Sequence, residues 1–230
     1  MSGAQISVGI IGANIHYGWG SRAHLPAIQG LPELQLTAVC TTRKETAEET
    51  ARQYGIPLVF DNPLDMVAHP DVDLVIVCVR APAHYNLTLA ALNAGKHVFC
   101  EWPLGANLEE AREIRDLAEA KGLRHMVGLQ GRGAPVLGYL RDLIAEGYVG
   151  EVLSCSMVGS FPGAGGPLNS AFAWMVEGIM GAHTLSIHSG HSIDALCFSL
   201  GEFRELSAKV TTQVKQRPVI ETGEGLEVTA

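Results

Sequence analysis

The chain has 230 residues, of which 47% are apolar and 17% charged, and its formal net charge is −8 at pH 7. This composition is typical of a globular protein and excludes a disordered chain. Acidic and basic residues are mixed without a Lys/Arg run, so we expect neither nucleic acid nor an anionic membrane as a partner.

The longest apolar run, Leu74–Val79, is far shorter than the roughly 20 residues of a membrane span. The N-terminus enters an apolar stretch almost at once and lacks the regions of a signal peptide. Five cysteines are scattered along the chain without a CxxC pair. These features predict a cytoplasmic protein with buried thiols rather than a disulfide framework.

The first 130 residues alternate short β-rich runs with amphipathic stretches. Strands are predicted at Ile6–Gly12, Gln35–Cys40, Leu74–Val79, His97–Glu101 and His125–Leu129. Helices are predicted at Arg22–Gln29, Lys44–Tyr54, Ala83–Ala94 and Leu108–Lys121, the last capped by Asn107 and ended by Gly122. Strands that are apolar on both faces suit a parallel sheet covered by helices. We therefore predict an α/β protein whose residues 1–130 form a Rossmann domain with a doubly wound parallel sheet.

Residues 131–230 show a different pattern. A helix is predicted at Pro135–Glu146 and a long helical stretch at Met180–Leu200, with alternating strands at Glu151–Ser160 and Glu205–Val214. This mixture predicts an α+β domain. Because another strand begins just before Ala230, we expect this domain to be incomplete.

A glycine-rich segment, Val8–Gly20, joins the first strand to the first helix. In a Rossmann fold this turn brings backbone N–H groups to a pyrophosphate, so Gly12, Ala13 and Asn14 are candidate cofactor contacts. Asn14 stands where GxGxxG has its second glycine, and asparagine tolerates a left-handed backbone. The alternative is an ordinary strand-to-helix loop.

The second strand ends in Thr41, Thr42, Arg43 and Lys44, with no carboxylate before Glu45. NAD sites usually have an acidic residue here for the ribose 2′-hydroxyl. Hydroxyl and guanidinium groups instead suit a 2′-phosphate. Thr41, Thr42 and Arg43 therefore favour NADP(H) over NAD(H), unless the cations are merely solvated at a helix start.

Four further segments carry a resemblance to a known family: Ala94–Val98, Glu101–Leu104, Leu143–Gly150 and Gly190–Asp194. Together they resemble the Gfo/Idh/MocA oxidoreductases over essentially the whole chain. Within that family the chain is most similar to the fungal galactose-pathway repressor branch, which it resembles at Gly18–Trp19, Glu101–Trp102, Leu129–Arg132 and Gly190–Asp194. That branch binds a nicotinamide dinucleotide and regulates through protein contacts.

The resemblance also shows departures. Family enzymes have a Glu-Lys-Pro lysine near the nicotinamide, where this chain has Trp102, and an aspartate four residues before the histidine, where it has Ile187. An indole cannot relay a proton at neutral pH. Of the usual Lys, Asp and His only His191 remains, which makes it the candidate catalytic acid or base. The resemblance also implies a cis bond between Trp102 and Pro103. It implies as well that residues 131–230 serve substrate binding and oligomerisation, with a homo-oligomer formed through the sheet of this domain where the domain is whole.

Other candidate contacts come from sheet edges, the domain junction and the resemblance. Cofactor contacts are expected at Val79, Arg80, His84, Glu101 and Trp102, although His84 also suits a purely structural role at a helix start. Substrate contacts are expected at Glu101, Trp102, Gln130, Trp174 and His188. His188 and His191 share one face of the predicted helix, but no cysteine or acid cluster completes a metal site, so none is predicted.

Two function classes remain. The first is an NADP(H)-dependent oxidoreductase acting on a sugar or a related polyhydroxylated or cyclic alcohol or ketone. The second is a dinucleotide-binding regulator that performs no turnover, which Trp102 and Ile187 favour. A small molecule, as substrate or effector, is the expected partner in both.

Overall fold

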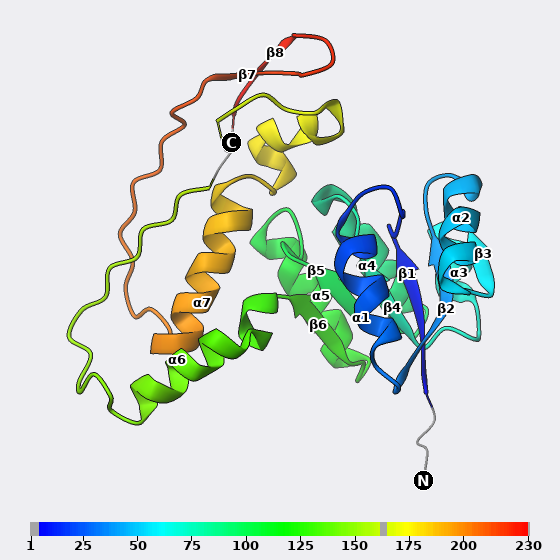
Figure 1. Ribbon diagram of the computed structural model, residues 1–230, viewed down its shortest axis with the longest axis horizontal. Coiled ribbons are helices and arrows are strands. Elements are labelled where there is room, and N and C mark those ends of the chain that lie inside the picture. The colour runs from blue at the N-terminus through cyan, green and yellow to red at the C-terminus, as the bar shows by residue number, and fades with distance from the viewer. Residues whose placement is uncertain (1–4, 162–164, 230) are drawn as a thin grey trace. The chain divides into compact units, whose positions relative to one another are not determined.

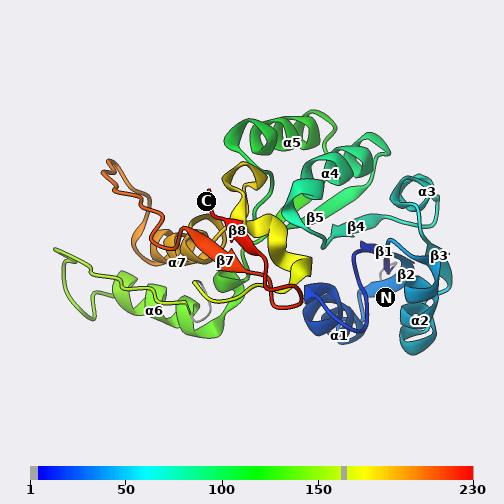
Figure 2. The same ribbon diagram turned by 90° about the horizontal axis from the view of Figure 1, so that it is seen from above.

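The computed structural model describes residues 5–161 and 165–229. The chain divides into two compact units at the Gly128–Leu129 bond. Each unit has its own arrangement of helices and strands (Figures 1 and 2). Within the described ranges, no helix is both long and apolar enough to cross a lipid bilayer.

The first unit is built on a six-stranded sheet in which every neighbouring pair is parallel. The strand order is β3-β2-β1-β4-β5-β6, the order of a dinucleotide-binding Rossmann sheet. The strands are β1 (Ile6–Ile11), β2 (Leu34–Cys40), β3 (Leu58–Phe60), β4 (Leu74–Val77), β5 (His97–Glu101) and β6 (His125–Gly128). This confirms the predicted doubly wound fold.

Five α-helices connect the strands: α1 (Leu25–Gln29), α2 (Lys44–Tyr54), α3 (Pro63–Ala68), α4 (His84–Asn93) and α5 (Leu108–Ala120). A π-helical turn, Gly20–His24, leads directly into α1. The predicted cap of α5 is present, since Asn107 Oδ1 accepts the N–H of Glu110 at 2.9 Å. Gly122 follows α5 with φ +65°, as expected of a glycine that ends a helix.

Two apolar clusters fill the two sides of the sheet. One contains Ile11, Val75 and Val77 and packs against α3, α4 and α5, while the other contains Ile10 and Ile76 with residues of α1 and α2. Successive strand residues therefore enter opposite clusters, as the alternation of a pleated strand requires. This explains why the central strands are apolar on both faces.

The sequence analysis missed β3 and α3. β3 has three residues and therefore carries no measurable alternation. α3 has six, and its start is fixed by local chemistry: Asn62 Oδ1 accepts the N–H of Leu64 at 3.0 Å, and Pro63 occupies the first turn. This short βα unit supplies the edge strand beyond β2.

The second unit contains α6 (Pro135–Ala145), α7 (Gly190–Leu200) and a two-stranded antiparallel sheet of β7 (Gln216–Pro218) and β8 (Gly225–Glu227). A π-helical turn, Leu185–Ser189, precedes α7, so the helical stretch predicted from Met180 is interrupted. α6 packs against α7, where Arg141 lies over the ring of Phe198 at 4.8 Å from its centroid.

The strands predicted at 151–160 and 205–214 are wrong for this structure. Both segments are extended and almost wholly exposed, and neither is paired into a sheet with another described segment. Alternating apolar residues indicate a strand with one apolar face, but a strand also needs a neighbouring strand to which it can hydrogen-bond. The sheet of this unit is formed instead by the later segments β7 and β8.

Candidate functional site

The carboxyl ends of β1, β2, β4 and β5 bring most of the predicted contacts of the first unit to one edge of the sheet. The strand order reverses between β1 and β4, because the chain runs outward to β3 and then returns to β4. Ligands of doubly wound proteins bind outside the carboxyl ends of the strands at such a switch point. The site is therefore expected beside the loop that follows β1.

Glycines fix the path of this loop. Gly12 has φ +98°, and a Cβ at this position would lie 2.0 Å from the carbonyl oxygen of Cys78. Gly18 has φ +101°, but its Cβ would meet no atom within 4 Å. Gly12 is thus required both by its backbone conformation and by the close approach of the segment that follows β4.

Asn14 shapes the turn differently from what we expected, because its φ is not positive. Its side-chain Oδ1 accepts the N–H of His16 at 2.9 Å, and its carbonyl oxygen accepts the N–H of Tyr17 at 3.3 Å. Asparagine therefore acts here through side-chain hydrogen bonding rather than through a left-handed backbone. Beyond this turn the side chains of Tyr17 and Trp19 are exposed.

The segment Thr41–Lys44 after β2, here called the selector segment, is the one expected to distinguish NADP(H) from NAD(H). It combines a buried threonine with exposed cationic side chains. The Thr41 hydroxyl lies 2.8 Å from the carbonyl oxygen of Arg43 and 2.6 Å from the hydroxyl of Thr46 on α2. Thr42, Arg43 and Lys44 are exposed. The fold also brings an acid that we had not considered, since Asp61 follows β3 and its charge adds to the effect of burial in raising the pKa of Cys40 to about 12.

A histidine–glutamate pair lies at the end of β5. Nε2 of His24 is 2.5 Å from Oε1 of Glu101, and the two side chains are only 13% and 15% exposed. The imidazole also packs edge-on against Phe99, two residues earlier on the same strand. On the other side, a Cβ at Gly128 would lie 2.7 Å from Oε2 of Glu101, so any larger residue there would require this carboxylate to shift.

Cys78 completes a group of three possible metal ligands with His24 and Glu101, whose ligand atoms all lie within 4.8 Å of one another. Burial, with a smaller effect from the charge of Glu101, raises the pKa of the Cys78 thiol to about 12. A metal needs the thiolate and would have to displace the hydrogen bond between His24 and Glu101. In the observed geometry the group is a hydrogen-bonded pair beside a neutral thiol.

The loop after β5 begins with a cis bond between Trp102 and Pro103, as the resemblance implied. His84 is 1% exposed and lies between two loops, with Nδ1 2.7 Å from the carbonyl oxygen of Pro103 and Nε2 3.1 Å from that of Val79. Its imidazole is therefore occupied by the backbone of the segments that follow β4 and β5. Arg80, next to Val79, is exposed.

The site residues predicted in the second unit lie in separate turns and helices of that unit. Trp174 donates from Nε1 to the carbonyl oxygen of Ala171 at 3.1 Å, which anchors its 3-10 turn. Gln130 is exposed at the start of another short turn. His188 lies in the π-helical turn with its ring 4.7 Å from that of Phe161, and His191 is the second residue of α7.

Two features of the second unit, an ion pair and a shifted histidine pKa, were not predicted. Arg132 donates from Nε and Nη2 to Oδ1 of Asp194, at 2.9 and 2.6 Å, and so connects the turn at Gln130–Gly133 to α7. Burial lowers the pKa of His183, which precedes the π-helical turn. The Arg132–Asp194 bond joins residues 62 positions apart, so no local sequence pattern indicates it.

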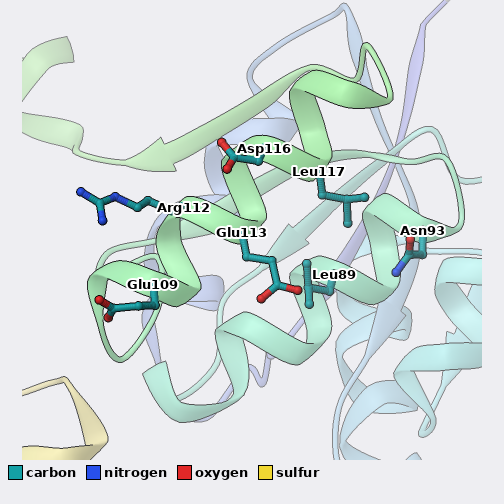
Figure 3. A pocket seen from close by; sticks show the side chains of 7 residues that line it. All are labelled: Leu89, Asn93, Glu109, Arg112, Glu113, Asp116 and Leu117. Carbon is teal, nitrogen blue, oxygen red and sulfur yellow. The ribbon is translucent and has the colours of Figure 1, made fainter.

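The first unit also has a surface hollow (Figure 3). It lies between α4 and α5 and is lined by Leu89, Asn93, Glu109, Arg112, Glu113, Asp116 and Leu117. The Tyr85 hydroxyl donates to Glu113 beside it at 2.6 Å. None of the residues expected to bind cofactor or substrate lines this hollow.

Comparison with known proteins identifies the family of the chain. Residues 6–129 match the model of the Gfo/Idh/MocA oxidoreductase family, which has an NAD-binding Rossmann fold. The chain belongs to this family. Residues 135–229 match the C-terminal domain of Gal80p. The resemblance inferred from the sequence motifs is thereby confirmed for both halves.

The curated relatives of the chain include a dehydrogenase and a regulator. The chain is 31% identical to dehydrogenase AclE of Aspergillus oryzae, over 81% of this chain and 51% of that protein. It is 26% identical to the galactose/lactose metabolism regulatory protein GAL80 of Saccharomyces cerevisiae, over 95% of this chain and 53% of that protein. The chain thus spans about half the length of these relatives.

The solved structures that are similar to this chain also include both a regulator and a dehydrogenase. A super-repressor mutant of Saccharomyces cerevisiae Gal80p matches with a TM-score of 0.88 and 26% identity, over 98% of this chain and 62% of that one. Levoglucosan dehydrogenase in complex with NADH and levoglucosan matches with a TM-score of 0.82 and 26% identity, over 98% of this chain and 61% of that one. The fold therefore serves both a regulator and a dehydrogenase.

Proposed function

We propose that this protein binds a nicotinamide dinucleotide at the carboxyl edge of the first unit and acts as an oxidoreductase on a sugar or a related polyhydroxylated or cyclic alcohol or ketone. The observation that carries the proposal is the loop at the switch point. There Gly12 allows close backbone approach, and among the described residues no side chain caps the helical segment that begins at Gly20. Such a loop suits a pyrophosphate.

NADP(H) is the preferred cofactor in this proposal. The Arg43 backbone is tied to Thr41 and Thr46 while its side chain is exposed at the end of β2, beside the exposed Thr42. A guanidinium there can bind a 2′-phosphate in bidentate fashion. The nearby Asp61 would oppose this preference, so the balance between Arg43 and Asp61 decides it.

The bound cofactor would supply or accept the hydride, and the chain has to hold it and move a proton. Trp102 cannot move that proton, because an indole does not titrate near neutral pH. We assign the role to His191, whose imidazole is suited to proton transfer in this range. Glu101 and Trp102 of the first unit and Gln130, Trp174 and His188 of the second are each proposed to contact the substrate, and Val79, Arg80 and Ala13 to line the cofactor.

A dinucleotide-binding regulator without turnover is the second candidate. It is favoured by the match of residues 135–229 to the Gal80p C-terminal domain and by Trp102 and Ile187, which replace two groups of the acid–base apparatus. The two candidates share the cofactor site and differ only in whether the chemical step takes place.

The experiment is a titration of the purified protein with NADPH and NADH, followed by nicotinamide absorbance assays with sugars, polyols and cyclic ketones. Binding with turnover, abolished by His191→Ala without loss of cofactor affinity, supports the enzyme. The matched control is His125→Ala, since His125 is an exposed histidine of β6. Binding without turnover across the panel favours the regulator, and no binding of either dinucleotide contradicts both.

A further inference from the structure

One face of α2 contacts both loops that are proposed to hold the cofactor. Thr46 and Thr50 lie one helical turn apart, and both are buried. Thr46 bonds to the selector segment after β2, and Thr50 bonds to the glycine-rich loop after β1. The exposed Glu49 adds a contact to the same loop, since its Oε2 lies 2.9 Å from Nε2 of His16.

Thr50 fixes the orientation of one peptide unit in the glycine-rich loop. Its side chain is fully buried, and Oγ1 lies 2.9 Å from the carbonyl oxygens of both Ala13 and Thr46, between which its single hydrogen is shared. In a trans peptide the C=O and the following N–H point in opposite directions. Holding the Ala13 carbonyl against α2 therefore turns the N–H of Asn14 away from α2.

Thr46 acts in the same way on the selector segment. Its Oγ1 lies 2.8 Å from the carbonyl oxygen of Arg43, which also accepts the N–H of Ala47 at 3.3 Å. Thr41 Oγ1 is 2.8 Å from the same oxygen. Two hydroxyls and one amide thus surround the Arg43 carbonyl. They fix the backbone from which the exposed guanidinium extends.

We propose that Thr50 and Thr46 are positioning residues that divide cofactor recognition between them. Thr50 orients the loop amide offered to the pyrophosphate, and Thr46 sets the position of Arg43 toward the 2′-phosphate. The inference rests on the proposed cofactor site and assigns two buried residues that were not among its expected contacts. Both dinucleotides have the pyrophosphate, but only NADP(H) has the 2′-phosphate. Loss of the Thr50 hydroxyl should therefore weaken both cofactors, and loss of the Thr46 hydroxyl should weaken NADP(H) alone.

A purely structural role for these hydroxyls predicts another result. Buried threonines also satisfy backbone carbonyls in proteins that bind nothing, and losing such a bond lowers stability without regard to ligand. A general loosening of the fold would reduce affinity for NADPH and NADH by the same factor in both variants. The ratio of the two affinities therefore separates positioning of Arg43 by Thr46 from a structural effect. For Thr50, where both affinities are expected to fall, 2′-AMP makes the separation, because it carries the 2′-phosphate and no pyrophosphate: a loosened fold weakens its binding as well, whereas a misplaced Asn14 amide leaves it unchanged.

The test measures NADPH and NADH binding by calorimetry for the wild type, Thr50→Val and Thr46→Val, with thermal unfolding of each. Thr50→Val is expected to weaken both cofactors about fivefold to tenfold, and Thr46→Val to weaken NADPH by that factor with NADH nearly unchanged. Thr88→Val is the control, because Thr88 is a buried threonine of α4, which packs on the side of the sheet opposite to α2. It should leave both affinities unchanged.

Serine variants make the comparison stricter. Thr50→Ser and Thr46→Ser keep the hydroxyl and should retain wild-type affinities, and alanine variants replace the valine ones if those fail to fold. Equal losses for both cofactors in Thr46→Val, or unchanged affinities in Thr50→Val, would overturn the inference while the cofactor site stands. A wild type that binds neither dinucleotide would overturn the proposed function and this inference together.

Discussion

His24 and Glu101, which are 77 residues apart in the sequence, meet at the carboxyl edge of the sheet with 2.5 Å between Nε2 and Oε1. The pair is largely buried, and the carboxylate is confined between the imidazole and Gly128. Their bond joins the segment that follows the glycine-rich loop to the residue that precedes Trp102. The position of Glu101 in the proposed pocket therefore depends on His24.

We predict that this pair is energetically coupled. A double-mutant cycle with His24→Gln and Glu101→Gln should give a coupling free energy of about 1–3 kcal/mol, because removing one partner leaves a buried polar group unsatisfied. Urea unfolding of the four proteins measures it. The exposed pair His16–Glu49, at 2.9 Å, is the matched control and should couple by less than about 1 kcal/mol. Equal coupling in the two cycles would contradict the role of burial.

A second prediction concerns the two glycines of the loop. Gly12→Ala should lower the free energy of unfolding by about 3 kcal/mol or more, because both the positive φ and the approach to the Cys78 carbonyl oppose a side chain. Gly18→Ala has a similar φ but open space, so its cost should stay near 1 kcal/mol. Chemical unfolding of both variants measures the difference. A similar loss in both would mean that backbone strain alone accounts for Gly12.

Most helices and strands of the first unit could be predicted because the sequence patterns that indicate them lie within each element. β5 shows an apolar run, and α5 shows a cap at Asn107 and a terminating glycine at Gly122. β3 and the strands expected at 151–160 and 205–214 failed for the opposite reason. A three-residue strand has no periodicity, and an alternating segment becomes a strand only where a neighbour provides hydrogen bonds.

The site was predictable only in part. The glycine-rich loop and the segment from Thr41 to Arg43 are recognisable because their chemistry lies in consecutive residues. The bonds of His24 to Glu101 and of Thr50 to Ala13 depend on tertiary contacts, and no spacing in the sequence indicates them. His84 illustrates the same limit. It was expected to contact the cofactor, although a structural role at a helix start also suited it, and the fold turns both ring nitrogens to backbone carbonyls.

Alkaline pH should destabilise the first unit through its buried thiols. Burial raises the pKa of Cys40, Cys78 and Cys100 from 9.0 to about 12. The folded state then retains protons that the unfolded chain releases above about pH 9, so the stabilising effect is complete below that pH and is lost as pH rises toward the folded pKa. Urea unfolding at about pH 8 and about pH 10 measures the loss.

The control for this prediction is the exposed cysteine of the second unit. Cys100→Ala should reduce the pH dependence between those two conditions, because one of the retained protons is absent. Cys155→Ala should leave it unchanged, since Cys155 is exposed. A pH dependence that is the same in the wild type and Cys100→Ala would show that other groups cause the alkaline loss.

The last prediction tests the assignment of the selector segment. Arg43→Asp should weaken NADPH binding about tenfold to a hundredfold, because it removes a charge-assisted contact and places a carboxylate beside the 2′-phosphate. NADH lacks that phosphate and should be affected little. Arg52→Asp makes the same charge change at an exposed position in the last turn of α2 and should spare the NADPH-to-NADH ratio. Calorimetric titrations at low and moderate salt measure both affinities. If Arg43→Asp weakens the two cofactors equally, Arg43 does not contact a 2′-phosphate, and the acid at Asp61 becomes the residue that sets the preference.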